Sequence, residues 1–270
     1  MKKLSVFITT LNNAKTLPCC LESVKWADEI VVLDTFSSDG TVAIAEKYGA
    51  KLFQHEFLGY GRQKQSALEK TTNDWVLLLD ADETLSDQLQ DEIKQILSTE
   101  PTYDGFELPR QEQLFWRMSS RFTRFNYQLR FFRKSVGALS TDAVHAAPKV
   151  SGRVGKLQHP FLHFGEINIH TKVEKINAYS SGMVEDKAKK GKQGSLLTLI
   201  LYPPIAFIQS YLFKRNIVNG SAGFIASVTM AYYAFLKYAK LREYHKFQKY
   251  GNSLLPDNAP DFLSEPEVPK

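Results

Sequence analysis

The first hundred residues alternate between short apolar stretches and amphipathic stretches, and this alternation constrains the fold more than any other feature. Four apolar stretches predict strands at residues 4–9, 29–34, 50–54 and 75–80. The intervening stretches predict helices that include Leu17, Leu21 and Val24, residues 41–48, residues 62–70, and a segment after Ser86 that buries Leu89, Ile93 and Ile96. Strand–helix units of this length predict a parallel sheet with helices on both faces.

Three of the predicted strands are followed by polar or loop residues. These are Thr9, Leu11 and Asn12 after the first strand, Asp34 at the end of the second, and Asp80 and Asp82 at the end of the fourth. A single aspartate at a strand end often only forms a turn or caps a helix. In parallel sheets, however, ligands bind beyond the carboxyl ends of the strands. Three such ends on one edge therefore favour a binding site.

The stretch VLLLDADETL (76–85) places two carboxylates at the end of a buried strand. Partial desolvation and like-charge repulsion make this placement unfavourable unless positive charge compensates it. A phosphatase of the haloacid-dehalogenase type would use Asp80 as a nucleophile, whereas a nucleotide-sugar transferase would use the pair to hold a metal ion and a nucleotide. The phosphatase also needs a later acidic pair after a strand, and Asp257 and Asp261 lie in PDNAPD with no strand before them. It is the lesser alternative.

A glycine-rich phosphate loop is not evident in the sequence. The nearest candidate, GYGRQK (59–64), has neither the P-loop spacing nor the dinucleotide-binding spacing. A bound nucleotide would therefore need a metal ion and basic side chains for its phosphates, and Arg62 and Lys64 are available.

Several longer stretches together resemble a known family. In chain order they are LSVFITTLNNAKTLPCCLESVKWADEIVVLDTFSSDGTVAIAEKYGAK, GYGRQKQSALEKTTNDWVLLLDADE, YQLRFFRK, VHAAP, GKLQHPFLHF and NGSAGFIASVTMAYYAFLKYAKL. The chain resembles the family-2 inverting glycosyltransferases of the GT-A fold. More narrowly, it is similar to the bacterial β-1,4-glucosyltransferases that add glucose to heptose in the lipopolysaccharide or lipooligosaccharide inner core. The resemblance covers most of residues 4–243.

The resemblance implies a fold and a set of binding residues. The fold is an α/β, Rossmann-like mixed sheet with helices on both faces, followed by a C-terminal helical region that associates with a membrane. The implied nucleotide-binding residues are Thr9, Leu11, Asn12, Asp34, Thr35, Lys64 and Asp80, and Asp82 is the implied metal ligand. A divalent cation, Mg²⁺ or Mn²⁺, suits carboxylate and phosphate oxygens and would neutralise the departing diphosphate.

The catalytic base is less clear from the resemblance. An inverting transfer needs a base for the attacking hydroxyl group, but Asn126 and Ala146 replace acids that are common in relatives. Asp142 is the substitute that we expect, together with His145, and Glu166 is another candidate. A catalytically impaired, membrane-associated relative that only binds nucleotide sugars is the alternative interpretation.

The C-terminal part is strongly basic and apolar. Residues 187–249 contain 11 Lys and Arg but only one acid, Glu243, whereas residues 1–110 contain 11 Lys and Arg against 18 Asp and Glu. Uncharged runs extend over 194–213, which Pro203-Pro204 is expected to break, and over 217–236. This composition favours helices that lie in the interface of an anionic membrane. A helical cap on the globular core and true membrane spanning are the alternatives, and nucleic acid is not an expected partner.

These patterns give an expected organisation and location. We expect a transferase domain at 1–186, a basic and apolar helical region at 187–250, and a disordered tail at 251–270. The only two cysteines are adjacent, which favours a reducing compartment, and the N-terminal apolar run is too short for a signal peptide. The expected location is therefore the cytoplasm, with the protein peripheral on the inner face of the cytoplasmic membrane. The expected partners are a UDP-sugar donor, a lipid-linked saccharide acceptor and the anionic membrane surface.

Overall fold

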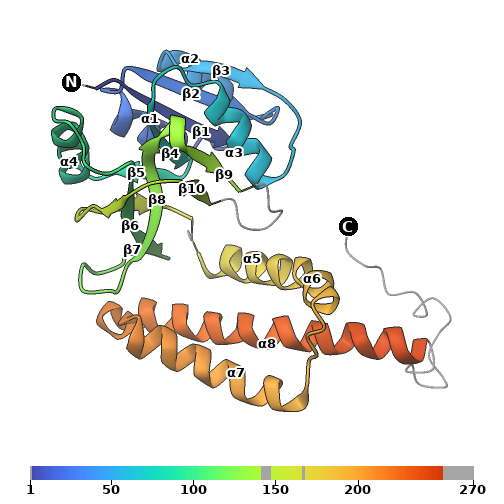
Figure 1. Ribbon diagram of the computed structural model, residues 1–270. Helices are drawn as coiled ribbons and strands as arrows, with labels where there is room; N and C mark the ends of the chain where they lie inside the picture. The colour runs from blue at the N-terminus through green and yellow to red at the C-terminus, as the bar shows by residue number, and fades with distance from the viewer. Residues whose placement is uncertain (1, 141–146, 166–167, 252–270) are drawn as a thin grey trace. The chain divides into compact units, whose positions relative to one another are not determined.

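The computed structural model describes residues 2–140, 147–165 and 168–251, and the chain divides into two compact units. The sheet unit comprises the described residues of Met1–Gln113 and Phe125–Gly165, and the helical unit comprises those of Leu114–Arg124 and Glu166–Lys270. Figure 1 shows the strands of the first unit and the helices of the second.

Four parallel strands form one half of the main sheet, in the order β3-β2-β1-β4. Their bounds are β1 Leu4–Thr10, β2 Glu29–Asp34, β3 Lys51–Gln54 and β4 Trp75–Asp80. The helices of this part are α1 Leu17–Val24, α2 Thr41–Lys47, α3 Tyr60–Glu69 and α4 Asp87–Leu97. The predicted order of strands and helices is confirmed, with small differences at the boundaries such as the start of α3.

The other half of the sheet contains antiparallel pairs. Strand β8 (Asn126–Arg133) runs antiparallel to β4 and to β6 (Gly105–Leu114), and β12 (Phe161–His163) lies between β6 and β5 (Glu83–Leu85). The remaining strands are β7 Arg117–Met118, β9 Gly137–Leu139, β10 Pro148–Val150 and β11 Val154–Lys156. The sheet is therefore mixed, as the family resemblance implies.

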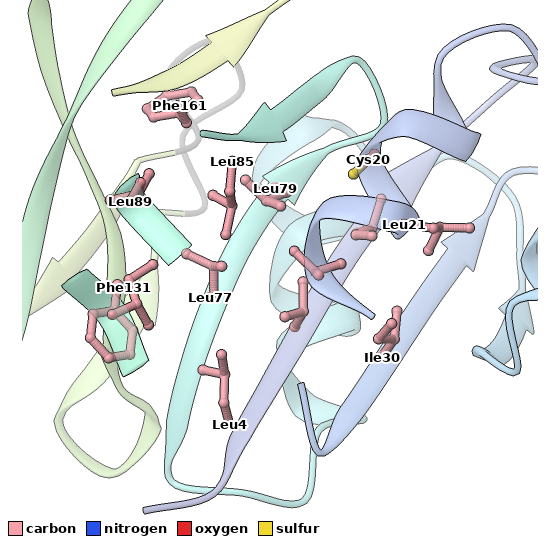
Figure 2. Close-up of a cluster of buried hydrophobic side chains, with 14 of the residues drawn as sticks. Leu4, Cys20, Leu21, Ile30, Leu77, Leu79, Leu85, Leu89, Phe131 and Phe161 are labelled. Atoms are coloured by element: carbon pink, nitrogen blue, oxygen red, sulfur yellow. The ribbon is translucent and has the colours of Figure 1, made fainter. Parts of the chain in front are cut away.

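The core of the sheet unit lies on both faces of the sheet. Along β1, Leu4, Val6 and Ile8 join one buried cluster, whereas Phe7 joins a second cluster with residues of α3. This alternation follows from the two-residue period of a strand. The first cluster is shown in Figure 2, where side chains of α1 and α4 meet those of the strands. Helices thus cover both faces, as predicted.

Helix α4 differs slightly from its predicted burial pattern. The Ser86 side chain caps the helix, because its Oγ accepts a hydrogen bond from the Leu89 backbone N–H at 3.2 Å. Leu89, Ile93 and Leu97 are buried, but Ile96 is only half-buried. The buried residues recur every four positions, so Leu97 faces the sheet more directly than Ile96 does.

The described residues of the helical unit form mainly helices. They are α5 Ile169–Gly182, α6 Val184–Lys189, α7 Leu196–Ile208, a π-helical turn Gln209–Phe213 and α8 Gly220–Tyr250, with a 3₁₀ turn at Asn216–Asn219. Helices α7 and α8 pack along each other. The predicted break at Pro203-Pro204 is wrong, because α7 continues through both prolines. The two prolines lack the backbone N–H that a helix uses as a donor. Beyond them the helical hydrogen bonding nevertheless continues, because the Gln209 N–H donates to the Ile205 and Ala206 carbonyls.

Only one helical segment of the described residues is long and apolar enough to cross a membrane. It is Leu196–Phe213, with a mean hydropathy of 1.6, and only 6% of it is buried inside the protein. Length and composition alone do not distinguish a spanning helix from one that lies on a membrane.

Candidate active site

The carboxyl ends of β1, β2 and β4 meet on one edge of the sheet. In the register of these strands, Thr10 is opposite Asp34 and Thr9 is opposite Asp80. Because the strands are parallel, the segments that follow them leave from the same edge. The residues predicted from the three strand ends therefore lie together in the sheet unit.

Asp80 is held between two cations. Its Oδ1 lies 2.6 Å from Lys64 Nζ, and its Oδ2 lies 3.3 Å from Arg130 Nη2. Burial alone would raise the pKa of Asp80, but the charges and hydrogen bonds of Lys64 and Arg130 lower it well below its usual range. Asp80 is therefore an anion at neutral pH, and the positive charge required by the DADE stretch comes from α3 and β8.

Glu83 forms a buried network with the same arginine. Its Oε1 lies 2.7 Å from Arg130 Nη2, and its Oε2 accepts a hydrogen bond from the Asp80 backbone N–H at 2.9 Å. Arg110 Nε is 3.9 Å from Glu83 Oε1. Burial raises the pKa of Glu83, although the charge of Arg130 opposes this effect. Glu83 thus fixes the turn that carries Asp80 and Asp82, and it orients Arg130.

Asp82 faces a histidine that the sequence analysis did not assign. Its Oδ2 lies 3.3 Å from His163 Nε2, and the Asp82 carbonyl accepts a hydrogen bond from the Phe164 N–H at 2.9 Å. His163 Nδ1 is 2.7 Å from Glu112 Oε2, and Glu112 also pairs with Arg110 at 3.1 Å. Burial opposes the charged imidazolium, but the two carboxylates raise the pKa of His163 to about 9. His163 also lowers the pKa of Asp82 against the effect of burial.

The Asp82 carboxylate fits a divalent cation that is shared with a diphosphate. Carboxylates are metal ligands, and Asp82 is 28% exposed at its side chain, whereas His163, with its raised pKa, is an imidazolium beside it. Among the described residues no group of three or more His, Cys, Asp or Glu is placed to hold a metal ion. Mg²⁺ and similar ions in phosphate sites commonly take one or two protein carboxylates and receive the remaining oxygens from phosphate and water. The single carboxylate of Asp82 is therefore compatible with such a site.

The loops after β1 and β2 hold each other through side-chain hydrogen bonds. The Asn12 N–H donates to Ser37 Oγ at 2.8 Å, and the Ser38 N–H donates to Asn12 Oδ1 at 2.9 Å. Asn12 has a positive φ of 53°, which asparagine adopts more readily than most residues. Leu11, beside it, is 51% exposed. Asn12 therefore shapes this loop, while Leu11 and the half-buried Thr9 remain accessible.

Asp34 is fully buried and already holds its own loop. Its Oδ2 accepts hydrogen bonds from the Ser37 N–H at 2.8 Å and from Gln54 Nε2 at 2.9 Å, and Ser37 Oγ donates to Oδ1. Thr35 Oγ1 accepts a hydrogen bond from Gln63 Nε2 at 2.9 Å. A carboxylate accepts about four hydrogen bonds. Asp34 thus has little capacity left for a ligand, and its position indicates a role in ordering the loop.

The structure leaves the predicted base outside the described residues. Asp142 and His145 lie in the segment 141–146, and Ala146 and Glu166 also fall outside the described ranges. Asn126 begins β8 opposite Arg110 and is exposed.

The sequence analysis missed five residues that complete the described network. They are Glu83, Arg110, Glu112, Arg130 and His163. Arg130 lies in the stretch YQLRFFRK and His163 in FLHF, both of which contributed to the family resemblance. Their presence in these two stretches was the available signal. Only the pairing of β8 and β12 with their neighbouring strands brings the two side chains to the aspartates.

The mixed sheet has the GT-A fold, which is the fold of many nucleotide-sugar transferases. Comparison with known proteins gives the family: residues 5–150 match Glycosyl transferase family 2, and the chain belongs to this family. It is a glycosyltransferase, and the phosphatase alternative is therefore wrong.

Relatives of similar length support this assignment. An uncharacterized glycosyltransferase of Rickettsia felis is 34% identical over 256 residues, which is 90% of each chain. The lipopolysaccharide core biosynthesis glycosyltransferase LpsC of Rhizobium meliloti is 32% identical over 251 residues, covering 90% of this chain and 93% of LpsC. The mannosyltransferase PcManGT of Pyrobaculum calidifontis, solved with GDP-mannose and Mn²⁺, is 16% identical with a TM-score of 0.53 over 90% of this chain and 88% of that chain. This last similarity concerns the fold.

Proposed function

We propose that this glycosyltransferase moves a hexose with inversion, specifically glucose from UDP-glucose, onto a heptose of a lipopolysaccharide or lipooligosaccharide core acceptor. The observation that carries the proposal is the pair Asp80 and Asp82, set among Lys64, Arg130 and His163 at the edge of the sheet. The similarity to LpsC, a glycosyltransferase of lipopolysaccharide core biosynthesis, supports the class of acceptor.

The residues of the described network have distinct roles in this proposal. Asp82, with His163 beside it, would hold a divalent cation, Mg²⁺ or Mn²⁺, together with the donor diphosphate. Such a cation neutralises charge on the leaving diphosphate. Lys64 and Arg130 fix the carboxylate of Asp80 for contact with the nucleotide, and both add positive charge near the phosphates.

The nucleoside part of the donor is assigned to the loops after β1 and β2. Thr9 and Leu11 would line the base, because Leu11 is exposed and Thr9 lies opposite Asp80 in the register. Asn12, Asp34 and Thr35 would contribute mainly by holding these loops. We retain Asp142, with His145, as the proposed base for the acceptor hydroxyl group.

The proposal includes a location. A lipid-linked acceptor lies at the membrane, and the helical unit has an exposed apolar helix and a strongly basic composition. We place residues 1–186 as the transferase domain in the cytoplasm, residues 187–250 as a peripheral region on the anionic inner face of the cytoplasmic membrane, and 251–270 as a tail.

Transfer of labelled glucose from UDP-glucose to a heptose-containing lipid A acceptor in the presence of Mn²⁺ tests the proposal. We expect transfer by the wild-type protein, loss of transfer in Asp82→Asn, and a strong reduction in Asp142→Asn. A Lys47→Gln variant, changed on exposed α2, is a matched control for the loss of one charge and should be active. Binding of UDP-glucose without transfer to any heptose acceptor would favour the alternative of an impaired, binding-only relative.

A further inference from the structure

The helical unit buries small and polar side chains and exposes large apolar ones. Its described buried residues include Ser180, Ser210, Asn219, Ala222, Ala226 and Ser227. Along α8, exposed Phe224, Val228 and Tyr232 recur at helical spacing on the face opposite this buried set. Small residues between helices and large apolar residues outside them are typical of helices that contact lipid.

The contact between α8 and the end of α7 with its π-helical turn combines a polar part with aromatic contacts, in which the Phe224 ring meets those of Phe207 and Tyr211. Ser210 Oγ and Ser227 Oγ are 3.0 Å apart, and Ser227 Oγ donates to the Gly223 carbonyl at 2.8 Å. Gly223 allows a close approach, because a Cβ there would lie 1.9 Å from the Asn216 carbonyl oxygen. Small and polar residues thus lie between the helices, while large apolar residues such as Leu197 and Val228 remain exposed.

A loop that follows β6 is fastened to the turn between α7 and α8. Asn219, in this turn, accepts a hydrogen bond from the Ser120 N–H at 2.7 Å and donates one to Thr123 Oγ1 at 2.9 Å. The Arg124 N–H donates to the Lys214 carbonyl at 3.1 Å. Phe115 is buried in a cluster with Ala222 and Ala226 of α8. We call residues 114–124 the docked loop.

The docked loop and the turn combine exposed aromatic and basic side chains. Trp116 is 63% exposed, Phe122 is 58% exposed and Phe213 in the turn is 68% exposed. The docked loop carries Arg117, Arg121 and Arg124, the turn adds Lys214 and Arg215, and residues 114–124 and 187–242 contain no acid. Aromatic and basic residues together match the headgroup region of an anionic bilayer.

The connections at both ends of the helix pair argue against a membrane-spanning arrangement. At one end, the turn holds the docked loop, whose flanking residues belong to strands β6 and β8. Further along α8, Lys240 Nζ donates to Asn177 Oδ1 of α5 at 2.6 Å and to Ser181 Oγ at 2.7 Å. If the helices crossed the bilayer with this turn on the far side, the docked loop and its three arginines would have to cross with the turn, which is strongly unfavourable.

We propose that α7 and α8 lie along the surface of an anionic phospholipid bilayer, and that the docked loop inserts Trp116 and Phe122 as a second membrane contact. The inference rests on the proposed membrane location and adds the loop that makes the contact. Because the docked loop connects β6 to β8 along the chain, its insertion would attach the sheet unit covalently to the membrane that carries the acceptor.

The fluorescence of Trp116 in the full chain tests this proposal. The protein has three tryptophans, and Trp75 is buried while Trp26 is half-buried, so Trp116 is the exposed reporter. With phosphatidylglycerol vesicles that carry brominated acyl chains, we expect a blue shift and quenching in the wild type. The conservative variant Trp116→Phe should float with the vesicles equally well but lose the quenching signal. The double variant Trp116→Ser/Phe122→Ser should float several-fold less.

Three outcomes would overturn the proposal. One is unquenched Trp116 in wild-type protein that floats, and another is a double-serine variant that floats as well as wild type. The third is labelling of Lys214→Cys, in a Cys19→Ser background, by an impermeant maleimide from outside intact bacterial spheroplasts, which would indicate spanning. Transfer to a water-soluble heptose acceptor is measured in parallel, so that loss of membrane contact is distinguished from failure of the proposed function.

Discussion

The two units of the chain differ in which side chains they bury. In the sheet unit, large side chains such as Phe7, Phe131 and Phe161 are fully buried and the strand-end carboxylates are paired with cations. In the helical unit, Leu197 and Phe213 are 65% and 68% exposed, while Ser210, Ser227 and Asn219 are buried. The helical unit therefore has little hydrophobic core of its own among the described residues.

This difference indicates which interactions stabilise the folded state of each unit. The sheet unit is stabilised mainly by the hydrophobic effect, which contributes about 25 cal/mol for each Å² of apolar surface that is removed from water. The helical unit is held by hydrogen bonds between its elements, each worth about 1 kcal/mol, and by aromatic contacts of Phe224, while much of its apolar surface stays exposed. The substitutions below separate these two modes, from the largest expected effect to the smallest.

Truncation in the sheet core should cost most. Phe131→Ala removes a fully buried ring that packs against Trp75 at 4.7 Å between centroids. We expect a loss of about 3–5 kcal/mol in the free energy of unfolding, measured by urea denaturation. Phe131→Leu is the control and should lose less than the alanine variant. Equal stability of wild type and Phe131→Ala would contradict the assigned core.

Removal of the buried arginine should also be severe. Arg130→Met leaves the fully buried Glu83 without its close cation, while Asp80 keeps Lys64, and an unpaired buried charge costs about 3–5 kcal/mol. The loss should shrink as the pH falls, because protonation of the carboxylates then removes the unpaired charge. Urea denaturation at pH 5 and pH 8 measures this, with the exposed Arg62→Met as control. A loss that does not change with pH would contradict the network.

The Asp82–His163 pair predicts a pH dependence in the absence of metal. Because the pKa of His163 is raised from 6.5 to about 9, its stabilisation is fully present below pH 6.5. It is lost as the pH rises through 9, with an upper size of about 3 kcal/mol. Unfolding in EDTA at pH 6, 7.5 and 9.5 measures it. His163→Gln should flatten this profile, and an unchanged slope in that variant would refute the assignment.

Loss of the docking hydrogen bonds should have a moderate effect confined to the helical unit. Asn219→Ala removes the partners of the Ser120 N–H and Thr123 Oγ1, at about 1–3 kcal/mol for buried polar groups left unpaired. We expect weaker vesicle binding with unchanged UDP-glucose affinity. Asn219→Asp keeps the acceptor for Ser120 and should lie between wild type and Ala. Equal vesicle binding by all three proteins would contradict the proposal that the docked loop contacts the membrane.

An exposed apolar residue of α7 should matter least for stability in water. Leu197→Ser changes a side chain that is 65% exposed, and we expect less than about 0.5 kcal/mol in the free energy of unfolding. Flotation with anionic vesicles should nevertheless decrease. Asp91→Ser, on the exposed face of α4, is the surface control and should leave flotation unchanged. A large stability loss in Leu197→Ser would show that α7 packs against protein.

The sequence predicted the sheet unit better than the helical unit for a physical reason. Local periodicity determines strands and helices, and parallel strands place their carboxyl ends together, so Asp34, Asp80 and Thr9 could be located without coordinates. Arg130 and His163 could not be assigned, because they reach the aspartates only through strand pairing across the mixed sheet. In α4 the sequence predicted that Ile96 is buried, whereas the buried residue is its neighbour Leu97.

For the helical unit, the composition of the sequence predicted a basic and apolar helical region, but not how its helices pack. Charge and apolar content predicted membrane contact, but the prolines suggested a break in α7 that the helix does not have. The contact between Asn219 and the docked loop joins residues 96 to 99 positions apart. No periodicity in the sequence signals such a pairing, which is why the docked loop was not foreseen.

The most direct measurement of the central claim is calorimetric titration of UDP-glucose into the wild type and into Asp82→Asn, with Mn²⁺ and with EDTA. The account predicts that Mn²⁺ strengthens binding to the wild type, and that this metal-dependent gain is absent in Asp82→Asn. Asp87→Asn, in the first turn of α4, should behave as wild type. The same Mn²⁺-dependent gain in Asp82→Asn would contradict the assignment of Asp82 and of the site built around it.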